Sequence, residues 1–161
     1  MKSTLRRIIL GMAVCALAGV MASATAQPKD GRMGEWKLNV EKSKFSPGPA
    51  PKSLTIVFEP AGKGVHLKAD TVGPDGARTQ TEYTANYDGK DYPLKGSQLA
   101  DTVSLKRVDK STVIRTDKKG GKKVTTLKSV LSKDGKTYTV DVTGTNAKGE
   151  PVKNHLVFER P

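Results

Sequence analysis

Between residues 35 and 159 the sequence is a succession of short segments in which apolar and polar residues alternate, separated by turns rich in glycine and aspartate. The stretch from Val65 to Asp70 shows the alternation clearly. A period of two residues is the pattern of a strand with one buried face, and strands spaced roughly 8–12 residues apart are typical of β-sandwiches and β-barrels. We therefore predict an all-β protein of about ten strands. The expected strands are 35–40, 53–59, 65–70, 78–87, 91–94, 102–108, 111–116, 123–131, 137–143 and 151–159.

The turns indicate how these strands connect. Short glycine-containing turns such as Gly73–Gly76 and Lys133–Lys136 join successive strands, which must then pair antiparallel in an up-and-down meander. Residues 41–52 contain three prolines and are expected to form a loop between the first two strands. A meander leaves two unpaired edges unless it closes on itself, so a barrel is the first choice. A strongly bent open sheet or a two-sheet sandwich is the second.

The N-terminal segment differs from the rest of the chain. Residues 1–26 have a basic beginning, an apolar middle and small residues at Ala24 and Ala26, which is the pattern of a bacterial-type secretory signal peptide. Its apolar run of about 15 residues is shorter than the roughly 20 that span a bilayer, so an uncleaved anchor is the less favoured alternative. Cleavage near Ala26 would leave residues 27–161 as one domain in the periplasm or outside the cell. Cys15 would leave with the signal, so that domain would contain no disulfide.

The charge of the chain is strongly positive. It carries 28 lysines and arginines against 16 aspartates and glutamates, a net charge of +12. Such a balance favours anionic neighbours, for example a membrane surface, an acidic glycan or an acidic ligand. The lysines are also scattered over turns and outward faces, where they keep a β-rich surface soluble and oppose edge-to-edge pairing of strands.

The first predicted strand carries a familiar motif. Gly34-Glu35-Trp36-Lys37-Leu38 resembles the Gly-x-Trp opening of the lipocalin and fatty-acid-binding-protein (calycin) superfamily, and the chain as a whole resembles small exported bacterial lipocalin-like proteins. The last strand, ending at Arg160, is similar to the closing strand of those barrels. The resemblance implies a barrel in which Arg160 packs over Trp36. Two features depart from the fatty-acid-binding pattern: a proline-rich loop replaces the helical lid, and Lys153-Asn154-His155 stands where that family has its Arg-x-Tyr pair.

The inward faces of the predicted strands supply the candidate ligand site. A barrel of about ten strands is wider than side chains readily fill, so it can hold a small ligand. Trp36 is expected chiefly as a core residue at the base, and ordinary packing is the alternative role for the tyrosines. If the ligand is acidic, Lys153, Arg107 or Arg115 could meet its head group. The predicted ligand-binding residues are Trp36, Leu38, Ile56, Phe58, Tyr83, Tyr87, Tyr138 and Val140.

Other chemistries find no support in the sequence. It contains no nucleophile elbow, no His-Glu-x-x-His motif and no phosphate-cradling glycine loop, so we expect no enzymatic activity and no cofactor. His66 and His155 point away from the apolar faces of their strands and have no cysteine or carboxylate cluster beside them, which argues against a metal site. No DNA- or RNA-binding motif accompanies the basic charge.

Two hypotheses of function follow. The first is a small exported barrel, expected to be a monomer, that binds or carries a hydrophobic or amphipathic, lipid-like small molecule. The alternative is a basic envelope-associated protein that contacts anionic lipid or glycan through its surface and holds no internal ligand. The first requires a cavity, whereas the second requires none and weakens as salt screens the charges.

Overall fold

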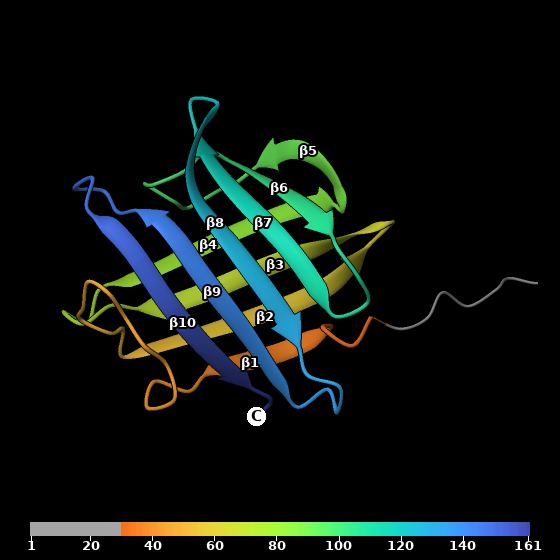
Figure 1. Ribbon diagram of the computed structural model, residues 1–161, viewed down its shortest axis with the longest axis horizontal. Helices are drawn as coiled ribbons and strands as arrows, with labels where there is room; N and C mark the ends of the chain where they lie inside the picture. Colours follow the sequence, from red (N-terminus) through yellow and green to blue (C-terminus); the bar gives the residue numbers. More distant parts are fainter. Residues whose placement is uncertain (1–29) are drawn as a thin grey trace, which may run out of the picture.

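The computed structural model describes residues 30–161, and this part of the chain forms ten β-strands and no helix (Figure 1). The all-β prediction and the number of strands are confirmed. The predicted signal peptide, residues 1–26, lies outside the described residues. The strands are β1 (Gly34–Leu38), β2 (Ser53–Ala61), β3 (Gly64–Val72), β4 (Arg78–Asn86), β5 (Asp88–Pro93), β6 (Thr102–Arg107), β7 (Thr112–Lys119), β8 (Lys122–Leu131), β9 (Thr137–Thr145) and β10 (Pro151–Glu159).

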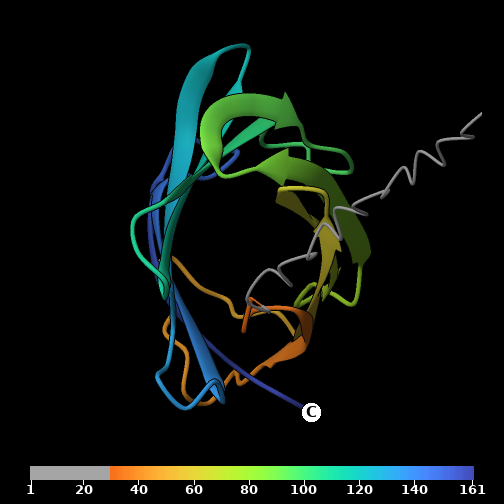
Figure 2. The same cartoon turned by 90° about the vertical axis from the view of Figure 1, so that its right-hand side faces the viewer.

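The strands form a single antiparallel sheet in the order β4-β3-β2-β1-β10-β9-β8-β7-β6-β5. β1 lies between β2 and β10, so the first and last strands of the chain are hydrogen-bonded neighbours, with Trp36 opposite Ile56 and Leu38 opposite Phe158. Figure 1 shows β7–β10 crossing in front of β1–β4, and Figure 2 shows the strands arranged as a ring. The predicted up-and-down meander therefore curls into a barrel rather than an open sheet or a sandwich.

The ring closes at a narrow seam between β4 and β5. These strands are consecutive in the chain, but they do not form a ladder. A single bridge closes the ring, between Glu82 on β4 and Lys95 just after the end of β5. The Glu82 N–H donates to the Lys95 carbonyl oxygen at 3.1 Å, and the Lys95 N–H donates to the Glu82 carbonyl oxygen at 2.9 Å. The barrel is thus nearly closed, and the seam is its weakest junction.

Several strand boundaries differ from expectation by one to three residues, and the largest shifts are at the start of β5 and the end of β7. The sequence Asp88-Gly89-Lys90 was expected to be a turn, but it begins β5, which contains an irregularity in register between Asp88 and Asp91. Gly89, with a φ of 76°, lets the strand bend there. β7 extends to Lys119, so the hairpin to β8 reverses on two glycines rather than four residues.

Four aromatic rings anchor the core. Trp36 is fully buried, and its ring centroid lies 5.5 Å from that of Tyr138. Tyr138 also contacts Phe58 at 5.6 Å, edge to face, and Phe158 at 6.1 Å. Aromatic pairs of this kind contribute about 0.5–1.5 kcal/mol each beyond the area they bury. They come from β1, β2, β9 and β10, so they bind the two crossed layers together.

The proline-rich segment after β1 is a loop, as expected, and it replaces part of the barrel wall. Beyond Leu38 the chain leaves β10 and returns to it further along. The Lys44 N–H donates to the His155 carbonyl at 2.7 Å, and the His155 N–H donates back at 2.9 Å. The Lys153 N–H donates to the Ser46 carbonyl at 2.8 Å. These bonds satisfy the edge of β10 that β1 does not cover.

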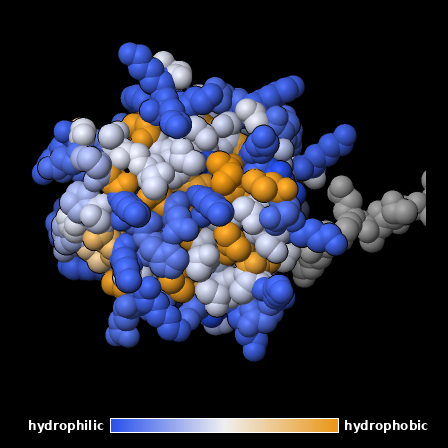
Figure 3. Space-filling model, in the orientation of Figure 1, coloured by the Kyte–Doolittle hydropathy of each residue, from blue (hydrophilic) through white to orange (hydrophobic). Residues whose placement is uncertain are grey.

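The outer surface is hydrophilic, with apolar side chains between the polar ones. Hydrophilic residues are spread across the face in Figure 3 rather than gathered in one patch. Both histidines face outward, as expected: His66 lies 3.3 Å from Glu59, and His155 lies 2.6 Å from Asp141. Among residues 30–161, no group of three or more histidines, cysteines and carboxylates could hold a metal ion, and no helix could cross a membrane.

Candidate ligand-binding site

The barrel encloses a cavity of about 210 Å³ between its crossed layers. This is roughly the volume of seven water molecules in the liquid, and it is smaller than the 300–1,000 Å³ or so of drug-sized pockets. One wall is apolar, because successive inward positions of β2 and β3 carry aliphatic or aromatic side chains. That wall consists of Leu54, Ile56, Phe58, Val65, Leu67 and Ala69.

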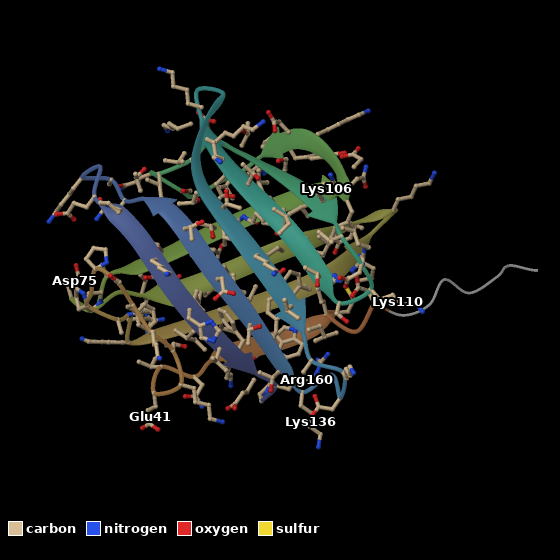
Figure 4. All side chains as sticks on the ribbon, viewed as in Figure 1. Glu41, Asp75, Lys106, Lys110, Lys136 and Arg160 are labelled. Carbon is tan, nitrogen blue, oxygen red and sulfur yellow. The ribbon has the colours of Figure 1, made fainter. Side chains whose placement is uncertain are left out.

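The two ends of the barrel differ. The end formed by residues 30–33 and the turns that carry Lys110 and Lys136 is called here the closed end; the end near Glu41 and Asp75 is called the open end (Figure 4). Phe58 and Tyr138, toward the closed end, are each 5% exposed. Lining residues toward the open end, such as Leu54 and Thr71, are only half-buried. Solvent therefore reaches the cavity from the open end.

Six of the eight predicted ligand-binding residues line this cavity: Ile56, Phe58, Tyr83, Tyr87, Tyr138 and Val140. The other two do not. Trp36 lies in the core at the closed end, the position expected for the base of the barrel. Leu38 packs against the edge of the core and borders a shallow surface groove beside Glu159 and Arg160. Both have the expected strand parity and lie opposite cavity-lining residues, Ile56 and Phe158, but neither side chain borders the cavity itself.

Arg160 covers the closed end. Its guanidinium carbon lies 4.3 Å from the centre of the Trp36 ring, as the family resemblance implied. Nη2 donates to the Gly31 carbonyl at 2.6 Å, Nη1 to the Met33 carbonyl at 3.2 Å and Nε to the Gly135 carbonyl at 3.1 Å. One side chain therefore ties the end of β10 to the lead-in segment and to the β8–β9 turn.

Arg32 is a cavity residue that the sequence pattern does not predict. Its segment reads as a loose lead-in, yet the Arg32 side chain is 1% exposed and lines the cavity. The backbone is held because the Trp36 indole N–H donates to the Arg32 carbonyl at 2.8 Å and the Met33 N–H donates to the Asp30 carbonyl at 3.0 Å. The only signal in the sequence is the turn pair Asp30-Gly31 ahead of the Gly-x-Trp motif, which suggests order but not burial.

Asp30 and Arg107 flank Arg32 at the closed end. Arg107 Nη2 donates to Asp30 at 2.7 Å, and its guanidinium lies 4.0 Å from the centre of the Tyr87 ring. Arg32 Nη1 lies 3.6 Å from the same carboxylate. Burial would raise the pKa of Asp30, but the hydrogen bonds from Arg107 and from the Arg32 backbone N–H outweigh it, so the pKa lies below its usual value. Asp30 is therefore a carboxylate shared by two arginines.

Arg115 is the second guanidinium in the cavity wall. Its Nε and Nη2 donate to the two carboxylate oxygens of Asp117 at 2.6 and 3.0 Å, and its guanidinium lies 4.9 Å from the Tyr83 ring centre. Of the three basic residues considered for a head group, Arg115 faces the cavity and Arg107 lies at its closed end. Lys153 is exposed on the outside of β10.

The cavity tyrosines are neutral hydrogen-bonding groups. Burial raises the pKa values of Tyr83, Tyr87 and Tyr138 above that of a free phenol, and for Tyr83 the nearby Arg115 only partly offsets the effect. The phenols therefore stay protonated at physiological pH and can donate to a ligand oxygen. The site combines an apolar wall with a few polar groups, which is the usual composition of a small-molecule pocket.

Comparison with known proteins gives a structural match but no sequence match. No protein-family model matches the chain, and no curated protein matches it. Zebrafish ileal bile acid-binding protein, solved in complex with cholic acid, superposes with a TM-score of 0.50 and 10% sequence identity, over 81% of this chain and 99% of that one. The chain has the calycin fold. The resemblance expected from the sequence is thus confirmed for the fold.

A second calycin structure matches more loosely. The siderocalin Ex-FABP, described as having dual ligand specificities, gives a TM-score of 0.38 and 11% identity, covering 81% of this chain and 71% of that one.

Proposed function

We propose that this calycin-fold protein binds a hydrophobic or amphipathic small molecule inside its barrel. The observation that carries the proposal is the cavity of about 210 Å³ with one continuous apolar wall and a few inward polar groups. Burial of apolar ligand surface against that wall would contribute roughly 25 cal/mol per Å². One structural neighbour of the same fold is a bile acid-binding protein, which supports a binding role.

The shape of the site suggests how binding occurs. The ligand enters at the open end, where Leu54 and Thr71 are half-buried, and its tail displaces solvent from the apolar wall. Trp36 and Arg160 close the opposite end, so the ligand does not pass through. No step requires chemistry on the ligand, and the proposed role is carriage or storage.

A dye-binding experiment with a cavity-filling variant tests this proposal. Ala69 lines the cavity, so Ala69→Trp should fill it, whereas Ala147→Trp places the same side chain in the exposed β9–β10 turn. The neutral dye N-phenyl-1-naphthylamine should bind the unmodified protein and Ala147→Trp equally, and Ala69→Trp at least about tenfold more weakly. Equal binding by all three folded proteins would place the dye outside the barrel and overturn the proposal.

The natural ligand can be sought directly. Native mass spectrometry of protein purified gently from its own host should show an added mass that disappears on unfolding. Its fragmentation would give the chemical class. A clean apo mass, under conditions in which a known lipid-binding barrel retains its ligand, would contradict tight carriage.

A second candidate function rests on the surface. The net charge of +12 and the hydrophilic residues spread over the outer face support contact with anionic lipid or glycan. Binding to vesicles containing phosphatidylglycerol, absent with phosphatidylcholine and lost at high salt, would favour this role.

We also propose that the protein is exported. The N-terminal sequence of protein purified from its host should then begin near Gln27.

A further inference from the structure

Arg32 is an unusual residue to find inside a barrel. Its side chain is 1% exposed and borders the cavity, and Nη2 donates to the Lys110 carbonyl at 3.0 Å. Nε and Nη1 have no hydrogen-bond partner among residues 30–161. Burying a charged group whose N–H donors have no acceptor costs free energy. A bound ligand that supplies hydrogen-bond acceptors would remove that cost.

The carboxylates near the cavity do not accept hydrogen bonds from Nε or Nη1 of Arg32. Asp117 accepts two hydrogen bonds from Arg115, so this pair is self-contained. The Asp30 carboxylate accepts a hydrogen bond from Arg107 Nη2 at 2.7 Å, whereas Arg32 Nη1 lies 3.6 Å from it, close enough for an ion pair but beyond hydrogen-bonding distance. Two arginines line the cavity. Arg115 is hydrogen-bonded to its own carboxylate, whereas Arg32 shares Asp30 with Arg107 and keeps two nitrogens without a hydrogen bond among residues 30–161.

We propose that Arg32 binds the head group of an amphipathic monoanion, such as a carboxylate with an apolar tail. This inference rests on the proposed function and names the ligand class. The head group lies deep in the cavity and accepts hydrogen bonds from the unused N–H groups of Arg32. The tail runs along the β2–β3 wall toward the open end. A carboxylate supplies acceptor oxygens and a negative charge beside Arg32, whereas a neutral lipid leaves Arg32 with only the Asp30 carboxylate that it shares with Arg107.

The neighbouring groups suit an anion. The Tyr87 ring centre lies 6.0 Å from the Arg32 guanidinium, and its phenol is a neutral donor. A volume of about 210 Å³ is too small for a long acyl chain or a sterol, whereas a medium-length chain can fill it and extend its tail through the open end. The geometry therefore points to a medium-chain acid as the best simple probe.

Calorimetry with decanoate and decanol separates the head-group site from the cavity. The chain lengths are equal, so only the charge differs. The unmodified protein should bind decanoate at least about tenfold more tightly than decanol, because a hydrogen bond to a charged group contributes roughly 1.5–3 kcal/mol. Arg32→Met should remove that preference while leaving decanol affinity within about twofold. The control Lys153→Met removes one exposed charge from the outside of β10 and should leave both affinities unchanged.

The outcomes are distinguishable. Equal affinity of the unmodified protein for decanoate and decanol would overturn the head-group site and leave the proposed function standing. Loss of the decanoate preference in Lys153→Met as well would assign it to general surface charge and overturn the site. Binding of neither probe would overturn both proposals.

A measurement on the unmodified protein covers the case in which Arg32→Met fails to fold. Decanoate labelled with ¹³C at its carboxyl carbon reports its own ionisation by NMR. Bound beside Arg32, the carboxylate should stay ionised at pH values where free decanoate is protonated, so its resonance should not shift as pH is lowered to that range. A bound resonance that titrates like free decanoate would place the head group in solvent and overturn the proposal.

Discussion

The guanidinium of Arg160 lies 4.3 Å from the ring of Trp36, so the last residues of the barrel cover the first. The same side chain donates three hydrogen bonds to carbonyls of the lead-in segment and of the β8–β9 turn. Trp36 in turn donates to the Arg32 carbonyl. The closed end is therefore a chain of contacts from β10 to β1 to the segment that places Arg32 in the cavity.

Replacing Arg160 should loosen this end. Arg160→Met keeps an apolar stem but loses the cation–π contact and the three hydrogen bonds, and it should lower the free energy of unfolding by about 1–2 kcal/mol. Urea denaturation followed by Trp36 fluorescence measures this. The control Arg78→Met changes an exposed arginine at the start of β4 and should stay within about 0.5 kcal/mol of the unmodified protein. An equal loss of unfolding free energy in both variants would contradict the stabilising role of the Arg160 contacts.

Asp30 should contribute stability that disappears in acid. Its pKa is lowered in the folded state, so the folded protein binds its proton less readily than the unfolded chain does. The contribution is present above the unfolded value of about 3.9 and is lost as pH falls through the lower folded value. Urea denaturation should therefore show Asp30→Asn less stable near pH 6, with the gap narrowing toward pH 3. A gap independent of pH would contradict this assignment.

The buried tyrosines should limit stability in alkali. Burial raises the pKa values of Tyr83 and Tyr138, so the unfolded chain loses these protons first as pH rises. Stability should be unaffected below about pH 10, where free phenols titrate, and should fall above it. Absorbance at the phenolate band should then rise together with loss of the barrel's circular dichroism. Tyr83→Phe should weaken the pH dependence, and phenolate formation by Tyr83 or Tyr138 while the barrel's circular dichroism is intact would contradict the prediction.

The seam between β4 and β5 should be sensitive to one methyl group. A Cβ on Gly96 would lie 1.9 Å from the Gln80 carbonyl oxygen on β4, and Gly96 has a φ of +74°. Gly96→Ala should therefore push Lys95 away from its bridge partner on β4 and lower the free energy of unfolding by more than about 2 kcal/mol. The control Gly62→Ala has a similar φ of +57° with nothing within 4 Å, and it should cost only about 1 kcal/mol. Hydrogen exchange at the Glu82 and Lys95 amides localises the effect.

The alternation of apolar and polar residues was enough to predict the strands and their inward faces. For example, Ile56 and Tyr138 line the cavity because side-chain direction follows strictly from strand parity. Parity does not determine which inward side chains border the cavity. Trp36 and Leu38 lie opposite Ile56 and Phe158, which line it, yet Trp36 is buried in the core and Leu38 packs against the core's edge. The outcome depends on how neighbouring side chains fill the interior, which the alternation of the sequence does not reveal.

Arg32, the buried arginine of the cavity, could not be predicted from the alternation of apolar and polar residues. Arg32 lies in a segment without periodicity, and its burial arises from long-range contacts with Lys110 and Trp36. The β5 start was missed for a related reason. Asp88-Gly89-Lys90 has turn chemistry, but pairing of Asp88 with Lys106 draws it into the sheet. In both cases tertiary contacts override the local signal.

The position of β1 between β2 and β10 has a consequence for how the protein is made. During synthesis one edge of β1 stays without a hydrogen-bonded strand until β10, Pro151–Glu159, has emerged from the ribosome. The barrel cannot be completed on the ribosome while those residues are still inside it. A chain built this way stays incompletely folded until β10 has left the ribosome, however early the other nine described strands form.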